Sequence, residues 1–324
     1  MSAPKNILAV ALFGKTEASY SSSLACTGST DTVEYCERPI FAASYANAGE
    51  RAFNEGTAGT KARVVPTART FATAIKLEAK GPATTMTATV VPPGGLHALM
   101  LASGYSASLI SGDWIYAQQV PDSPFSSVQF EVYQEGKLYK ACAAYSDMKF
   151  SLDKAVNGFF TFDVKGLIGL PTSVARANTN YAYQSVLPPV GVSVGLSIGS
   201  FTTAIVRKID FALGRTIDPR EDLNSANGHS GFSPGRRKTV LNITIEQVDI
   251  ATFNPYADLA AATPKVVSFV LGQVNNNNIT FSGSFATLAD VKEGNESNNV
   301  STWDLVYDLP DSPTLNDGHS WKWS

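Results

Sequence analysis

The stretch YQEGKLYKACAAYSDMKFSLDKAVNGFFTFDVKGLIG, residues 133–169, decides the fold class of this chain, because strand-like runs follow one another with only short turns between them. In MKFSLD (148–153) apolar and polar residues alternate, which is the pattern of a half-buried strand. Asn157-Gly158 is a strong two-residue turn signal, and FFTFDVKG (159–166) returns after it. With the alternating run SVQFEVY (127–133) before it, the stretch predicts a meander of four short antiparallel strands.

The composition is that of a folded protein with room for more than one domain. The chain has 324 residues, enough for two hydrophobic cores, and 44% of them are hydrophobic, which argues against disorder. The net charge is −3, with 14 basic and 14 acidic residues in 1–166 and 11 and 14 in 167–324. Neither half has the basic excess typical of a nucleic-acid binder. No apolar run reaches about 18 residues, so no membrane insertion is expected.

The residues that usually carry chemistry are few and scattered. Cys26, Cys36 and Cys142 are predicted to be reduced thiols, with a Cys26–Cys36 disulfide as the alternative. The three histidines lie far apart in the sequence and do not show the spacing of metal ligands. No nucleophile elbow, phosphate-binding loop or zinc-protease motif is present. We therefore expect no enzyme activity, no catalytic or metal-binding residues and no cofactor.

Beyond the meander, the sequence predicts more strands, two helices and two long loops. One helix lies in PPGGLHALMLASGYS and ends at Gly104, and another begins at Pro255 with Asn254 as its cap. Residues 47–69 and 215–237 are predicted to be long loops, and 106–126 to be irregular. The other predicted strands are RPIFAASYA, TFATAIKLEAKG, FTTAIVRKIDFALG, KTVLNITIEQV, PKVVSFVLGQV, NNNITFSGSFATL and STWDLVYDL.

The order of these elements repeats, which predicts two tandem domains in a mainly β protein. Each half runs strand, long loop, strand, helix and then a set of strands. Trp321 and Trp323 close the chain in a polar segment, and we expect them to dock on a neighbouring surface. The predicted divisions are an N-terminal arm (1–37), a first domain (38–170), a linker around Pro188 (171–199), a second domain (200–310) and a C-terminal tail (311–324).

Several blocks of sequence occur in a characteristic order. The lead LFGKTEASYSSS (12–23) has the pattern K-x-E-x-x-Y, and the helical block LHALMLASGYSAS (96–108) follows it. The meander ends on F-x-x-x-G-L-x-G (162–169), and PGRRKTVLNITIEQVD (234–249) places arginine before an alternating run. In this order the blocks resemble the tail tube (major tail) proteins of long-tailed, non-contractile bacteriophages. Ala143 or Ala144 stands where that family often has glycine.

The resemblance implies two tandem tail-tube-type domains, each a β-sandwich or half-barrel with one packed α-helix and long loops. It implies a structural virion protein that stacks as rings to form the tail tube, the conduit for genome ejection. A duplicated chain would form a homotrimer that imitates a hexameric ring, with the long loops between rings. The implied partners are further copies of the chain, a tape-measure protein and a tail terminator, with DNA only as non-specific passing cargo. The implied location is the virion tail, after assembly in the host cytoplasm.

A channel that passes DNA needs a wall that does not bind phosphates, so a neutral or acidic polar face is expected to line it. The alternative for each polar face is an outer surface in contact with solvent. Two other functions compete with the tube: a surface β-sandwich adhesin or carbohydrate-binding module, and an enzyme without a recognisable motif. The candidate lumen-facing residues are Gln129, Glu131, Asp163, Glu246, Asp304 and Asp308.

Overall fold

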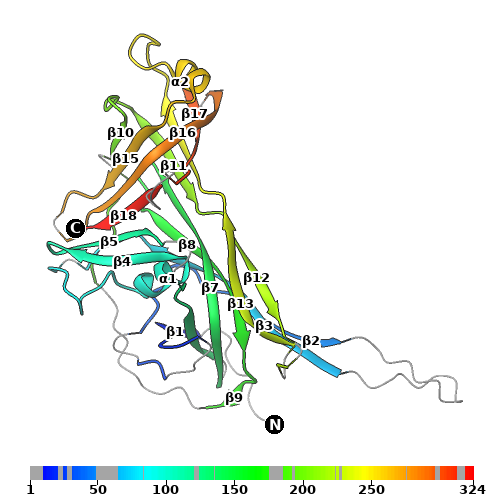
Figure 1. Ribbon diagram of the computed structural model, residues 1–324. Helices are drawn as coiled ribbons and strands as arrows, with labels where there is room; N and C mark the ends of the chain where they lie inside the picture. Colours follow the sequence, from blue (N-terminus) through cyan, green and yellow to red (C-terminus); the bar gives the residue numbers. More distant parts are fainter. Residues whose placement is uncertain are drawn as a thin grey trace, which may run out of the picture.

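Two antiparallel sheets face each other in this chain, as Figure 1 shows, and the predicted mainly β class is confirmed. The fold is seen in a computed structural model. The structure describes residues 10–20, 25–27, 31–48, 65–82, 84–119, 124–134, 136–174, 185–191, 194–222, 224–225, 228–274, 276–295, 300–311 and 318–324.

The larger sheet, called here the first layer, contains most of the predicted strands. Its main path runs β2-β3-β8-β7-β11-β14-β17-β16, and β6 and β1 continue from the first half of β7. The N-terminal arm thus contributes a strand, β1, to this layer. The bounds are β1 Val10–Thr16, β2 Ala42–Ala48, β3 Val65–Glu78, β6 Val128–Gln134, β7 Lys137–Asp153, β8 Phe159–Ile168, β9 Thr172–Ser173, β11 Val206–Ala212, β14 Val240–Glu246, β16 Ile279–Asn295 and β17 Ser301–Asp308.

The smaller sheet, the second layer, has the order β10-β15-β16-β18-β5-β4. The long strand β16 belongs to both layers. Its first residues pair with β15 and β18, and from Thr287 onward it pairs with β17. A register shift between Leu288 and Asp290 lies near this corner, as expected where a bulge bends a strand. The bounds are β4 Tyr105–Ile110, β5 Asp113–Gln118, β10 Gly195–Ile198, β15 Lys265–Leu271 and β18 His319–Trp323.

Aromatic side chains fill the space between the layers. The Trp321 ring lies 5.1 Å from those of both Phe150 and Phe160, between centroids, and 4.9 Å from that of Phe281. Trp321 and Trp323 are both 0% exposed. The expectation that they dock on a neighbouring surface is therefore wrong: alternation along β18 turns them into the core of their own chain.

The two short helices begin and end where the sequence predicts. α1 (Leu96–Ala102) is followed by Gly104, whose φ of 85° only glycine adopts freely. α2 (Pro255–Ala261) is capped by Asn254, whose side chain accepts a hydrogen bond of 3.0 Å from the backbone N–H of Ala257.

The meander departs from prediction in its second and third strands, which form the single 17-residue strand β7. A register shift between Cys142 and Tyr145 changes which residues of β7 face the core. The alternation of apolar and polar residues therefore breaks there, and the sequence resembles two separate strands. Ala143 lies in this bulge with a φ of 50°.

Two segments predicted to lack regular structure are hairpins. The stretch 106–126 contains most of β4 and all of β5, joined at Ser111 and Gly112, which both have positive φ. The predicted loop 215–237 is a two-stranded ribbon of β12 (Arg215–Glu221) and β13 (His229–Arg237). Charged residues and two prolines hide its alternation. Of the other predicted loop, residues 49–64 lie outside the described residues.

The pairing pattern of the first half recurs in the second. β2 pairs with β3, β3 with β8, β8 with β7 and β7 with β6. In the same way β11 pairs with β14, β14 with β17, β17 with β16 and β16 with β15. The halves share a sheet through β7 and β11, and one core cluster extends across both. The proposed domain boundaries stay a prediction.

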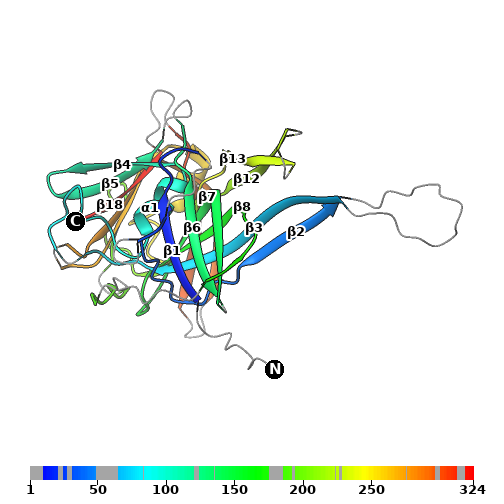
Figure 2. The same ribbon diagram turned by 90° about the horizontal axis from the view of Figure 1, so that it is seen from below.

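A ribbon formed by β2 and the first part of β3 projects from the body, most clearly in Figure 2. β3 pairs with β8 only from Thr70 onward, so Val65–Arg69 has β2 as its sole ladder partner among the described residues. A two-stranded ribbon is at best marginally stable alone in water, so the projecting part lacks the support that the rest of the sheet has.

Replacing Ala143 by glycine tests the strain at the bulge. The variant loses one buried methyl group, which lowers the free energy of unfolding by about 1 kcal/mol. It also removes the strain of a positive φ at a residue with a Cβ, which raises that free energy by about 1 kcal/mol, so the net change is close to zero. Ala144→Gly is the matched control, because Ala144 is equally buried and has no positive φ; it loses the methyl group and adds backbone entropy, costing about 1–2 kcal/mol. Urea unfolding measures both, and equal losses would contradict the assignment.

Candidate functional site: the polar face of the first layer

The outer face of the first layer is a broad polar surface formed by side chains that alternate with the core positions. Residues opposite each other across the ladders share this face, which links β3, β8, β7, β11, β14, β17 and β16. Acidic residues outnumber basic ones on it. The charged side chains at its ladder positions are Lys76, Glu78, Asp147, Lys149, Asp153, Asp163, Lys165, Lys208, Asp210, Glu246, Asp290, Lys292, Asp304 and Asp308.

Four of the six candidate residues lie on strands of this continuous face. Asp163 is on β8, Glu246 on β14, and Asp304 and Asp308 are on β17. Thr244 of β14 donates a hydrogen bond of 2.6 Å to Asp304 Oδ1, which ties the two strands together on the outer side. Whether the face lines a channel stays a prediction, but the structure does bring these four carboxylates onto one surface.

The other two candidates, Gln129 and Glu131 of β6, are covered in the single chain. Gln129 is 2% exposed and Glu131 is 6% exposed. The Gln129 amide is 3.8 Å from the Cys26 sulfur, and Glu131 forms an ion pair of 3.1 Å with Lys140. The expectation of a polar face open to water on β6 is therefore wrong, because the sequence did not reveal what packs over this strand. Their predicted lumen position stays a prediction.

Ion pairs between strands β7 and β8 and along strand β11 partly neutralise the polar face. Lys149 and Asp163 are 2.6 Å apart, and Lys208 and Asp210 are also 2.6 Å apart. The pKa of each lysine is raised, chiefly by its hydrogen bond to the aspartate. Because these side chains are largely exposed, such pairs contribute little to stability. Their consequence is electrostatic: no cluster of unpaired lysines forms among the ladder positions.

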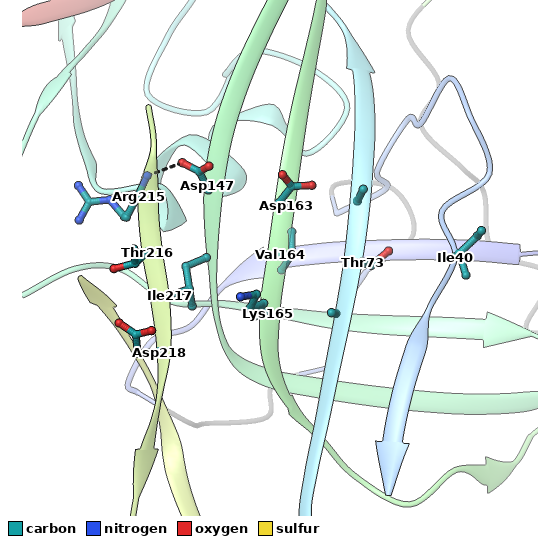
Figure 3. Close-up of a pocket in the computed structure, with 12 residues that line it drawn as sticks. Ile40, Thr73, Asp147, Asp163, Val164, Lys165, Arg215, Thr216, Ile217 and Asp218 are labelled. Carbon is teal, nitrogen blue, oxygen red and sulfur yellow. Dashed lines mark hydrogen bonds between the residues drawn. The ribbon is translucent and has the colours of Figure 1, made fainter. Parts of the chain in front are cut away.

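A trough of about 660 Å³ lies on this face beside the β12–β13 ribbon (Figure 3). Asp147 accepts a hydrogen bond of 2.8 Å from the backbone N–H of Arg215, while the Arg215 guanidinium points away from Asp163 and Lys165. Burial raises the pKa of Asp147. Among the residues that the structure describes, no aromatic side chain lines the trough, so this lining lacks the stacking surface of a typical sugar site.

The K-x-E-x-x-Y motif holds the ribbon and the bulge in place. Glu17 accepts a hydrogen bond of 2.7 Å from the backbone N–H of Ala143 and bonds the Ser127 hydroxyl. The Tyr20 hydroxyl donates to the carbonyl of Phe232 at 3.0 Å and accepts from the N–H of Phe232 at 2.9 Å. Sequence reasoning used these residues only as a family signature, since their partners are more than 100 residues away.

Burial keeps two of the three cysteine thiols in their protonated form. All three cysteines are free thiols, so the alternative Cys26–Cys36 disulfide does not form. Burial raises the pKa of Cys26 to about 12 and that of Cys36 to about 11, which suppresses the reactive thiolate. In the described part of the chain, no three histidine, cysteine or acidic residues are grouped so that they could hold a metal ion. No helix there has both the length and the hydrophobicity to span a bilayer.

Comparison with known proteins adds no assignment to this geometry. No protein-family model matches the chain, and no curated protein matches its sequence. The resemblance to tail tube proteins therefore rests on the sequence blocks described above.

His319 lies in a buried polar cluster that joins the C-terminal strand to its neighbours. Its Nε2 is 2.7 Å from the Tyr105 hydroxyl and its Nδ1 is 2.5 Å from the Gln118 amide nitrogen. Arg237 of β13 donates to Gln118 at 2.6 Å and forms an ion pair with Asp311. Burial, with a smaller contribution from Arg237, lowers the pKa of His319 to about 3. The ring is fully enclosed, so this cluster is a structural lock and not a substrate site.

The His319 lock should make stability fall in acid. Its pKa is about 3 when folded and 6.5 when unfolded, so between these values only the unfolded state binds the proton. The contribution is complete above pH 6.5 and is lost as pH falls toward 3, at about 1.4 kcal/mol per pH unit. We expect His319→Gln to remove this part of the slope when unfolding free energy is measured across pH. Equal slopes in both proteins would contradict the lock.

Proposed function

We propose that the chain is the structural subunit of a phage tail tube, assembling into rings that stack around a channel for the genome. The observation that carries the proposal is the first layer itself: a wide antiparallel sheet with a polar outer face. The edge strands at both ends of its main path have no further ladder partner among the described residues. Exposed strand edges are an aggregation hazard in a monomer, but they are joints in an assembly.

The charge of the polar face supports a channel role. DNA binds basic walls strongly because phosphate contacts release counterions. A face on which Asp163, Asp304 and Asp308 lie among paired lysines offers no such basic track. A wall of this kind repels DNA weakly and lets it slide.

The two ribbons support the stacking of rings. The β2–β3 ribbon projects from the body, and β12–β13 forms a separate two-stranded sheet on the same layer. In the repeated order of strands, the β2–β3 ribbon is formed by the first two strands of the first half, and β12–β13 lies between the first two strands, β11 and β14, of the second half. We propose that both make contacts between rings, and that three chains, each supplying two similar halves, form a pseudo-hexameric ring.

Electron microscopy and native mass spectrometry of the purified protein test this function. We expect rings or tubes under the microscope and a three-chain species by mass, because each chain carries the repeated pairing pattern. Six-chain rings would contradict the trimer and leave the tube standing. A monodisperse monomer at all concentrations would contradict the tube and favour a surface-binding module.

Reversing one charge on the polar face tests its place in the channel. Asp304→Lys should change the free energy of unfolding by only about 0.5 kcal/mol, because the side chain is exposed. Phage tails built from this variant should eject DNA more slowly, most strongly at low salt, where phosphate attraction is least screened. Ejection kinetics over a range of salt concentrations measure the effect.

Asp113→Lys is the matched control for that substitution. Asp113 lies in the second layer and, like Asp304, has one polar side-chain partner, an ion pair of 3.0 Å with Lys322. Its reversal should leave ejection unchanged. Equal rates for wild type, Asp304→Lys and Asp113→Lys at every salt concentration would remove the polar face from the channel wall.

A further inference from the structure

The repeated pairing pattern extends to the short strands at the ends of each half. β1 pairs with β6 as β10 pairs with β15. β9 follows β8 and pairs with the start of β7, and β18 follows β17 and pairs with the start of β16. The long strands β7 and β16 both have 17 residues. Every ladder of the first half except β4–β5 thus has a counterpart in the second.

In the first layer one further ladder joins the halves inside the chain, in addition to the β5–β18 ladder of the second layer. β11, the first strand of the second half's main path, pairs antiparallel with the last residues of β7. In this register Ala212 lies opposite Lys149 and Phe211 opposite Phe150. The ladder is the chain's own example of how one repeat joins the next.

β11 and β7 pair with each other along one edge of each strand. The corresponding edges in the opposite halves have no ladder partner among the described residues. β2 corresponds to β11, and its ladder is with β3 alone. β16 corresponds to β7, and its last part, Thr287–Asn295, pairs only with β17. The main path of the first layer therefore begins at β2 and ends at β16. These two strands correspond to β11 and β7, which pair with each other inside the chain.

Corresponding strand ends show which residue of the first half matches which residue of the second half. β3 ends at Glu78 and β14 at Glu246. Ala42 is opposite Ala72, six residues before Glu78, and Ala212 is opposite Val240, six residues before Glu246. Ala42 therefore corresponds to Ala212.

The same comparison fixes the other edge. Glu78 is opposite Phe159, and Lys149 is opposite Thr161, two residues further along. Glu246 is opposite Thr302, and Lys292 is opposite Asp304, again two residues further along. Lys292 therefore corresponds to Lys149.

The sequence agrees with this alignment. Residues 38–42 read RPIFA and residues 208–212 read KIDFA, so a basic residue, a phenylalanine and an alanine coincide. Phe41 stacks on Phe71 with centroids 5.5 Å apart, on the inner side, where Phe211 also lies. The outward position differs: Asp210 is replaced by Ile40, which is 82% exposed. Ile40 therefore lies exposed on the outer face, next to the edge of β2 that has no ladder partner among the described residues.

We propose that a second copy of the chain covers this edge: β2 of one copy pairs antiparallel with Thr287–Asn295 of the next, with Ala42 opposite Lys292. The inference rests on the proposed ring-forming function and gives it a specific joint. Ile40 then faces Gly294, which has no side chain to obstruct it. β2 carries no charged residue and no proline, so its edge lacks the usual protection against pairing. The interface is head-to-tail, the kind that closes into a ring when the rotation per copy allows.

A cysteine pair tests the joint and its register. Ala42→Cys and Lys292→Cys are combined in a chain in which Cys36, the exposed native thiol, is serine. Directly opposite residues in an antiparallel pair lie close enough for a disulfide after small adjustments. Mild oxidation should convert the monomer band into dimers and larger multimers on a non-reducing gel, and reduction should reverse this. Each single variant should give no multimers beyond a dimer.

Ala42→Cys with Val291→Cys is the matched control. Val291 packs against the core on the opposite face of β16, so a shift of one residue should abolish the cross-link. Rings seen by microscopy without a 42–292 cross-link, or with equal cross-linking of the control pair, overturn the joint and leave the tube function standing. Cross-linked multimers that never stack into tubes support the joint and overturn the tube function. A protein that stays monomeric and never cross-links overturns both.

Discussion

The packing of Trp321 between the two layers is the interaction on which the rest of the structure depends. Its ring touches aromatic residues from β7, β8, β11, β15 and β16, so one side chain near the C-terminus contacts both halves of the chain. Truncating a buried aromatic residue typically costs about 3–5 kcal/mol, a large part of the stability of an ordinary domain. β18 also pairs with β5 on one side and β16 on the other, so it closes the second layer. The core between the two layers therefore depends on β18.

The second constraint is the alternation of strands with one buried and one polar face. Once the inner side chains of the first layer are committed to the aromatic core, register places every second residue on the outer face. The carboxylates of β8 and β17 are thus brought to one surface as a consequence of core packing. Among the described residues, the same packing leaves one edge of β2 and one edge of Thr287–Asn295 in β16 without a ladder partner. In this way the core determines both the polar face and the proposed joints.

Bulges and short polar contacts adapt the regular sheet to this arrangement. The shift near Ala143 bends β7 so that its first half pairs with β6 and its second half with β11. Glu17 satisfies the backbone of the bulge, and Tyr20 holds the β12–β13 ribbon against the layer. These contacts give a physical reason for the K-x-E-x-x-Y motif at the start of the chain. They position the strands and ribbons and need no catalytic group.

The sequence by itself determined the β class, both helices with their ends, and most strands, because alternation, capping residues and turn residues act over a few positions. It also placed Asp163, Glu246, Asp304 and Asp308 on the polar sides of their strands. Tertiary structure decided that Gln129 and Glu131 are covered, that Trp321 and Trp323 belong to the core, and that residues 215–237 form a ribbon. These outcomes depend on which distant strand or loop packs against a segment. Local periodicity does not carry that information: it shows which face of a strand is polar, and only the assembled sheets show what lies over that face.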